Sequence, residues 1–165
     1  MITSSSVSRI PLLKALLARP VTEPAPPSSE TGVRSRSSGS VQLRHVDAGS
    51  CNGCEIEIAQ AFAPVCDAGR FGARLVASPR HADGLLVTGV VTKNMAVPLQ
   101  MTFEATPRPR VVVACGDCAV NGGLFAGAYG VAGSVHDVVP VDVEIPGCPP
   151  EPSEITEALR RLTGR

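Results

Sequence analysis

The chain of 165 residues has no tryptophan, and aromatic residues make up only 3% of it. It also has no net charge, because fifteen basic residues balance fifteen acidic ones. Binding to nucleic acid depends on a surplus of Lys and Arg facing phosphates, so this balance argues against nucleic acid as a partner. No apolar run approaches the ~18 residues of a membrane-spanning helix, and no signal-peptide pattern follows Met1. These absences predict a one-domain protein of the cytoplasm, soluble or peripheral on something larger.

The charges are distributed unevenly along the chain. Residues 1–45 carry six basic and two acidic residues, whereas the remainder carries nine basic and thirteen acidic ones. The basic part contains RIPLLKALLARP, in which apolar residues recur at helical spacing and predict a short amphipathic helix. A stretch rich in Pro, Ser and Thr follows and is typical of a flexible linker. We therefore expect an amphipathic arm and linker over residues 1–40 and a folded domain over residues 41–165.

Short apolar runs bounded by Gly and Pro alternate with helical patterns in the folded domain. VQLRHV predicts an outer strand, ARLVAS, GLLVTG and RVVVACG predict buried strands, and DVVPVDVEI predicts a weaker one. Helices are predicted at CEIEIAQAF, VPLQMTFEA and SEITEALRRL, with Ser153 as the cap of the last. Strands that are apolar on both faces and separated by helices favour an α/β domain with a mainly parallel sheet covered on both sides.

Five of the six cysteines fall in predicted loops or at predicted strand ends. The carboxyl ends of parallel strands share one edge of a sheet, where ligands gather. We therefore expect cysteines that are distant in the sequence to converge there. Cys66 follows a helix and is expected to be a packed free thiol. The five are Cys51, Cys54, Cys115, Cys118 and Cys148.

Three kinds of chemistry fit these thiols. Two C-x-x-C pairs could hold zinc, but zinc ribbons place their pairs ~15–20 residues apart, and Cys148 would be left over. A thioredoxin-like redox pair fits CNGCEIEI and leaves three cysteines unexplained. Four thiolates around an iron–sulfur cluster account for more of them, because the flanking glycines allow the backbone to approach the sulfurs closely. The cluster is favoured, with zinc and thiol redox chemistry as alternatives.

Four motifs in order carry a resemblance to a known family. DAGSCNGCEIEI, SPRHADGLLVTGVVT, ACGDCAVNGGLF and VPVDVEIPGCPPEP resemble the small iron–sulfur subunit of energy-converting nickel–iron hydrogenases and formate hydrogenlyase complexes. The small cluster-bearing subunit of respiratory complex I (NADH:quinone oxidoreductase) is its relative. The resemblance covers about three quarters of the chain, from Val41 to the last helix, and we expect a flavodoxin-like, three-layer α/β domain.

The resemblance implies one [4Fe-4S] cluster held by Cys51, Cys54, Cys118 and Cys148. It further implies an electron-transfer subunit without a complete active site, bound to a large hydrogenase-like subunit and to further iron–sulfur and membrane subunits. Such a subunit would lie on the cytoplasmic side of the membrane as a peripheral part of the complex. The spaced Cys51–Cys54 pair favours the hydrogenase branch, since complex I subunits have adjacent cysteines there. A quinone-reducing complex, or a zinc-bound structural or assembly protein of the same fold, is the alternative.

Two charged residues are candidates for tuning the cluster. Glu57 matches an acidic position of the family and is a candidate for proton-linked or potential-tuning chemistry, whereas Glu55 is expected to be exposed. Arg80 is expected at the same edge of the sheet as the cysteines, where a guanidinium would offset the negative charge of a four-thiolate cluster. The resemblance requires no cysteine at the position of Cys115, which we expect to be a small core filler.

Overall fold

The computed structural model describes residues 39–165 of the chain, and their apolar runs form a parallel sheet of five strands. Every residue of β3 and β5 is buried, as expected for strands that are covered on both faces. The spatial order is β2-β1-β3-β5-β7, so the sheet strands in chain order lie as 2-1-3-4-5. This is the flavodoxin-like order, and it confirms the predicted fold. The strands are β1 (Val41–Asp47), β2 (Ala73–Leu75), β3 (Gly84–Thr88), β5 (Val111–Cys115) and β7 (Val143–Ile145).

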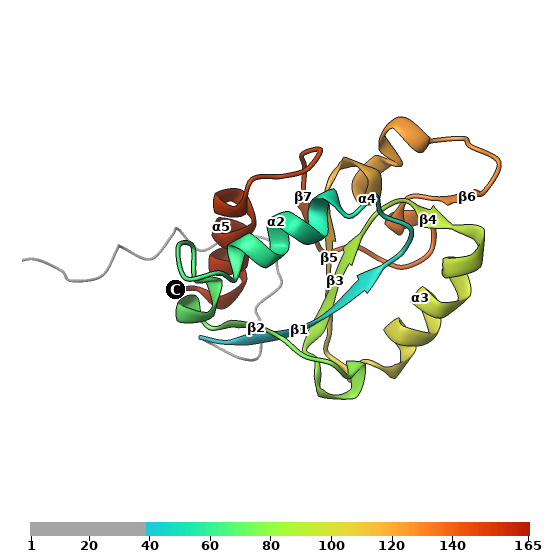
Figure 1. Ribbon diagram of the computed structural model, residues 1–165. Helices are drawn as coiled ribbons and strands as arrows, with labels where there is room; N and C mark the ends of the chain where they lie inside the picture. The colour runs from blue at the N-terminus through green and yellow to red at the C-terminus, as the bar shows by residue number, and fades with distance from the viewer. Residues whose placement is uncertain (1–38) are drawn as a thin grey trace, which may run out of the picture.

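Helices cover both faces of this sheet and complete the three layers (Figure 1). On one face, α2 (Gly53–Ala61) and α5 (Pro152–Thr163) pack on each other, and Ile58 and Leu159 join their shared core. On the other face, α3 (Lys93–Ala105) and α4 (Asp117–Asn121) contribute Leu99 and Ala119 to a second core. The three predicted helices correspond to α2, α3 and α5, whereas α4 is not among the helices predicted from the sequence. The sheet separates two apolar cores.

Short elements connect these layers. An antiparallel pair, β4 (Val91–Thr92) with β6 (Val131–Gly133), lies outside the main sheet and was not predicted from the sequence. Four 3-10 turns lie in the connections of the described part of the chain, residues 39–165. They are η2 (Ala68–Phe71), η3 (Pro79–His81), η4 (Gly123–Phe125) and η5 (Val135–Asp137).

Four details of the predicted elements are wrong. ARLVAS does not form a buried strand, because β2 lies at the edge of the sheet with Arg74 and Leu75 exposed. The strand VQLRHV is not an outer strand, because β1 pairs with β2 on one side and with β3 on the other. In DVVPVDVEI only Val143–Ile145 forms a strand, since Pro140 cannot donate to a ladder. The cap of α5 is not Ser153. Glu151 caps the helix instead, in a capping box in which Glu154 Oε2 accepts from the Glu151 amide at 3.0 Å.

The predicted amphipathic arm and most of the linker, residues 1–38, lie outside the described residues. Between residues 39 and 165, no helix is long and apolar enough to cross a membrane. The first strand of the sheet, β1, starts at Val41.

Candidate metal centre

The cysteine loops leave from a single row of paired strand ends. Asp47 of β1 pairs with Thr88 of β3, Thr88 pairs with Cys115 of β5, and Cys115 pairs with Ile145 of β7. Cys51 and Cys54 follow the first of these strands, Cys118 follows β5, and Cys148 follows β7. The site therefore includes the β1/β3 switch point, where ligands bind in doubly wound sheets.

Hydrogen bonds shape the first loop, from β1 to α2. Asp47 Oδ1 accepts from the amides of Gly49 and Ser50, each at 2.8 Å. The hydroxyl of Ser50 accepts from the amide of Asn52 at 3.1 Å, and Asn52 takes a left-handed conformation with φ of 68°. The chain turns sharply here, so that Cys51 is exposed while Cys54, in the first turn of α2, is buried.

A pair of reciprocal hydrogen bonds joins the loops that carry Cys118 and Cys148. The amide of Asp117 donates to the carbonyl of Gly147, and Asp117 Oδ1 accepts from the Gly147 amide, both at 2.8 Å. Gly116, the residue before Asp117, donates to the carbonyl of Ile145 at 2.8 Å. Each of these cysteines is thus next to a residue of this clamp, and their positions are coupled.

Two glycines make room for the sulfurs. A Cβ at Gly116, whose φ is +93°, would lie 2.5 Å from Cys54 Sγ. A Cβ at Gly123, with φ of +51°, would lie 3.0 Å from Cys118 Sγ. Real Cβ atoms do not approach a sulfur as closely as the first of these distances, and only glycine takes such backbone conformations without strain. The backbone is therefore shaped around the two thiols.

The other three predicted ligand thiols act electrostatically on Cys118. The pKa of Cys118 is raised above its ordinary value, first by burial and then by the neighbouring thiols of Cys148, Cys54 and Cys51. The four residues that the resemblance implies as ligands therefore lie on segments that follow the same row of strand ends, near enough for three of them to act on the fourth.

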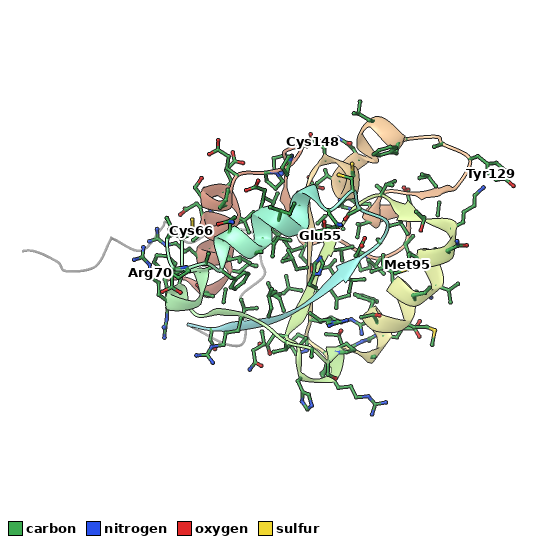
Figure 2. The ribbon with its side chains drawn as sticks, in the orientation of Figure 1. Glu55, Cys66, Arg70, Met95, Tyr129 and Cys148 are labelled. Carbon is green, nitrogen blue, oxygen red and sulfur yellow. The ribbon has the colours of Figure 1, made fainter. Side chains whose placement is uncertain are left out.

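Cys115 has a different place. It ends β5, is fully buried, and its thiol forms a hydrogen bond with Cys54. This bond lowers the pKa of Cys54, and together with burial it raises the pKa of Cys115. Cys115 is therefore part of the core, as predicted, and it is also a donor to the sulfur of Cys54. Figure 2 shows Cys66 far from Cys148, near Arg70, and Cys66 lies in the turn after α2.

Sequence reasoning missed a polar network beside the first loop. Glu55 was expected to be exposed, yet only 19% of its side chain is, and it accepts hydrogen bonds from the hydroxyls of Ser50 and Thr88. His45 Nε2 lies 2.9 Å from Thr88 Oγ1. Burial lowers the pKa of His45, against the opposing effect of Glu55. A helical pattern alone does not show that Glu55 faces the ends of β1 and β3.

The structure separates Arg80 from the cysteines. Arg80 lies in η3, which precedes β3, whereas the cysteine loops lie at the carboxyl ends of the strands. The length of β3, ~13 Å at ~3.3 Å per residue, lies between them. The expectation that Arg80 shares their edge is therefore wrong. Glu57 lies on α2, one turn from Cys54, half-buried and without a hydrogen bond or ion pair to the residues of the described domain.

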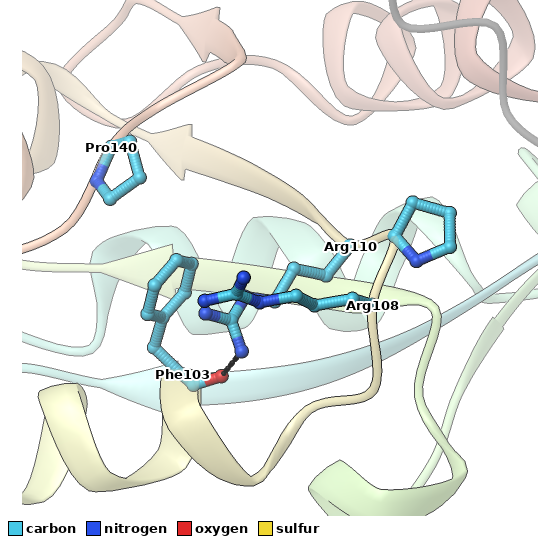
Figure 3. A pocket seen from close by; sticks show the side chains of 5 residues that line it. Phe103, Arg108, Arg110 and Pro140 are labelled. Atoms are coloured by element: carbon cyan, nitrogen blue, oxygen red, sulfur yellow. Dashed lines mark hydrogen bonds between the residues drawn. The ribbon is translucent and has the colours of Figure 1, made fainter.

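A groove of about 650 Å³ lies at the same far edge, where the chain enters β5 (Figure 3). Arg110 stacks on the Phe103 ring at 3.6 Å and donates to the Phe103 carbonyl at 2.6 Å, so it closes the end of α3.

Within residues 39–165 no three His, Cys, Asp or Glu side chains are grouped closely enough to hold a single metal ion. The ligands of a four-iron cluster each bind a different iron, so their sulfurs do not have to meet at one point.

The fold and the site define a class, flavodoxin-like α/β domains that gather cysteine thiols at the carboxyl edge of the sheet. The chain belongs to the family of the 20 kDa subunit of NADH ubiquinone oxidoreductase, whose family model matches residues 51–162. This family includes small subunits of complex I and of energy-converting hydrogenases, so the resemblance seen in the sequence is confirmed.

Two relatives and one solved structure illustrate the similarity. The chain is 49% identical over 115 residues to a probable membrane-bound hydrogenase subunit of Pyrococcus furiosus, covering 70% of this chain and 69% of that protein. It is 48% identical over 114 residues to formate hydrogenlyase subunit 7 of Escherichia coli, covering 69% of this chain but only 45% of that protein. A chain of the archaeal membrane-bound sulfane sulfur reductase superposes with a TM-score of 0.66 at 33% identity, covering 76% of this chain and 70% of that one.

Proposed function

We propose that this chain is an electron-transfer subunit that holds one [4Fe-4S] cluster through Cys51, Cys54, Cys118 and Cys148. The observation that carries the proposal is that all four cysteines lie on segments that follow one row of strand ends, Cys51 and Cys148 in loops and Cys54 and Cys118 in the first turns of α2 and α4. The glycine backbone around Cys54 and Cys118 supports it, because it leaves no side chain between the sulfurs and a bound group. When bound, such a cluster supplies a one-electron carrier.

The residues of the chain bind and orient this group. Cys54 is the buried ligand, and the thiol of Cys115 donates to its sulfur from the core side. Hydrogen bonds to ligand sulfurs stabilise negative charge and raise the reduction potential. The clamp between Asp117 and Gly147 holds Cys118 and Cys148 at a constant separation. None of these residues has a role toward a substrate in this proposal, so a partner subunit would supply the active site.

A partner subunit would cover the cysteine edge. Large apolar side chains are exposed beside the ligand loops: Ile56 follows Cys54 by two residues and is 59% exposed, while Leu124 and Phe125, in η4 after Cys118, are 91% and 48% exposed. Exposed apolar groups beside a functional site are typical of an interaction surface. We propose a large hydrogenase-like subunit as the partner, within a peripheral arm of a membrane-bound complex on the cytoplasmic side.

The choice between a hydrogenase-type and a quinone-reducing complex rests on the first loop. Asn52 and Gly53 separate Cys51 from Cys54, a spacing that resembles the hydrogenase branch. The two relatives described above, at 48% and 49% identity, are named as hydrogenase-type subunits. We therefore favour a hydrogenase-type complex, and a complex I-like quinone reductase is the second candidate.

Anaerobic reconstitution of the full chain with iron and sulfide tests the cluster. We expect a brown protein with about four irons per chain and an electron paramagnetic resonance (EPR) signal after reduction. A colourless protein that retains zinc instead would overturn the proposal in favour of a structural or assembly role. Purification with the large subunit, followed by hydrogen and quinone assays, separates the two complexes: hydrogen-dependent dye reduction supports the first, and quinone reduction alone supports the second.

A further inference from the structure

The carboxylate of Glu55 bridges three parts of the site. Ser50 Oγ, in the loop before Cys51, donates to Glu55 Oε2 at 2.6 Å. Thr88 Oγ1, at the end of β3, donates to Glu55 Oε1. Glu55 itself belongs to α2 and directly follows Cys54. One side chain therefore ties the first ligand loop and the helix that carries the second ligand to the edge of the sheet.

The direction of the hydrogen bonds follows from the donors available. A carboxylate accepts only, so Thr88 uses its single hydroxyl proton toward Glu55. The contact between His45 Nε2 and Thr88 Oγ1, at 2.9 Å, then needs a proton on Nε2. His45 Nε2 also lies 3.5 Å from Glu55 Oε1. The Thr88 proton thus points toward the carboxylate, and the Nε2 proton of His45 points toward Thr88 Oγ1, so His45 orients Thr88 and Thr88 orients the carboxylate.

The hydroxyl of Ser50, the residue before Cys51, makes two hydrogen bonds that hold the backbone around Cys51. It donates to Glu55, and it accepts from the amide of Asn52 at 3.1 Å. Cys51 lies between Ser50 and Asn52 and is exposed, so packing does not hold its side chain. The position of the Cys51 thiol relative to Cys54 therefore depends on the Ser50 hydroxyl, and through it on Glu55.

Glu57 provides a matched comparison on the same helix. It is a glutamate two residues beyond Glu55, also half-buried, but it makes no hydrogen bond or ion pair with the residues from 39 to 165. The two carboxylates have the same charge, lie on the same helix and are both within three residues of Cys54. They differ in the network that only Glu55 joins.

We propose that Glu55 is a positioning residue that sets the place of Cys51 against Cys54 through the hydroxyls of Ser50 and Thr88. The inference rests on the proposed function, since it assigns a role toward the cluster that those cysteines would hold. Without the carboxylate, Ser50 loses its acceptor and the side-chain link from the Cys51 loop to Thr88 is lost, while the Ala48 amide still donates to the Thr88 carbonyl. Cys51 is then the ligand that leaves first.

The experiment compares full-length chains reconstituted with iron and sulfide. The variants are Glu55→Ala, Glu55→Gln and Glu57→Ala, with Thr88→Val as a second route to the same network. Iron loss to a chelator is followed over time, and the EPR line shape is recorded after reduction. We expect Glu55→Ala to lose iron several-fold faster than the wild type and to change the line shape, while Glu57→Ala loses iron at the wild-type rate. Glu55→Gln should rescue both, because its amide can still join Ser50 and Thr88.

Each outcome of this experiment either supports or overturns the inference. If the wild type takes up no cluster, the proposed function fails and this inference fails with it. If the wild type loads normally and Glu55→Ala keeps its iron as long, only this inference is overturned. A Glu57→Ala chain as labile as Glu55→Ala, or a Glu55→Gln chain that shows no rescue, also overturns it. If Glu55→Ala does not fold, Thr88→Val decides: faster iron loss supports the inference, and an unchanged rate overturns it.

Discussion

Replacing Cys115 and Cys148 separately by alanine should give opposite results in two measurements. Cys148 is exposed in a loop, whereas Cys115 is fully buried at the end of β5. The ligand set proposed here contains Cys148 and omits Cys115, whereas a zinc site made of the two C-x-x-C pairs would contain Cys115 and omit Cys148. The two substitutions therefore distinguish the two sites.

The expected magnitudes follow from burial and hydrogen bonding. Cys115→Ala removes a buried group of about methyl size, worth ~0.5–1.5 kcal/mol, and a hydrogen bond to Cys54 worth a further ~0.5–1.5 kcal/mol. The free energy of unfolding of the metal-free chain should thus fall by ~1–3 kcal/mol. Cys148→Ala changes an exposed loop and should alter the same quantity by less than ~0.5 kcal/mol.

Urea unfolding of the metal-free chains and EPR spectroscopy of the reconstituted chains measure the two effects. We expect Cys115→Ala to be less stable but to retain the cluster signal, at a lower midpoint potential because a donor to Cys54 is gone. Cys148→Ala should be as stable as the wild type but lose or alter the signal, since one iron lacks its thiolate. Retention of metal by Cys148→Ala and its loss from Cys115→Ala would refute the assignment.

Three further predictions concern the surroundings of the site. Gly116→Ala should lower the iron content per chain, because its Cβ would lie 2.5 Å from Cys54 Sγ. Gly127→Ala is the control, since Gly127 has a φ of +78° and open space around it, and its iron content should not fall. Equal losses of iron in the two variants would point to backbone strain alone. Burial lowers the pKa of His45 in the folded chain, so the unfolded chain takes up a proton at a higher pH than the folded chain does. The metal-free chain should therefore keep its full stability above pH 6.5 and lose stability as the pH falls below it. Urea unfolding at several pH values should show a flatter profile for His45→Gln, and an unchanged profile would contradict this. Arg80→Met should leave the midpoint potential unchanged, since η3 lies at the far edge, and a clear shift would contradict that placement.

The sequence predicted which edge of the sheet the cysteine-bearing segments leave, because the relevant information is local. Apolar runs such as those of β3 and β5 define strands, and cysteines just after a strand must lie at its carboxyl end. That the segments carrying Cys51, Cys118 and Cys148 leave one edge then follows from parallel pairing. The strand pattern grouped Cys115 with these cysteines, and the resemblance set it apart as a core filler, in agreement with its burial at the end of β5.

The errors arise where the path of a connection decides the outcome. Arg80 follows β2, and the sequence does not show that η3 leads directly into the amino end of β3. Glu55 and Glu57 have the same chemistry on one helix, and only the direction of α2 against the sheet decides which one meets Thr88. Ser153 and Glu151 are both able to cap α5, and the pairing of Glu151 with Glu154 decides between them.

The row of strand ends from Asp47 to Ile145 also determines where the protein can change during evolution. Neighbouring strands lie ~4.8 Å apart whatever the length of chain that connects them, so the spacing of the thiols is inherited from backbone pairing. An exposed segment such as residues 126–130 can lengthen at a small entropic cost. A single residue inserted within β5 would instead turn its side chains to the opposite faces and move Cys115 out of the row. New partner-specific segments can therefore be added to the loops while the arrangement of the four thiols stays the same.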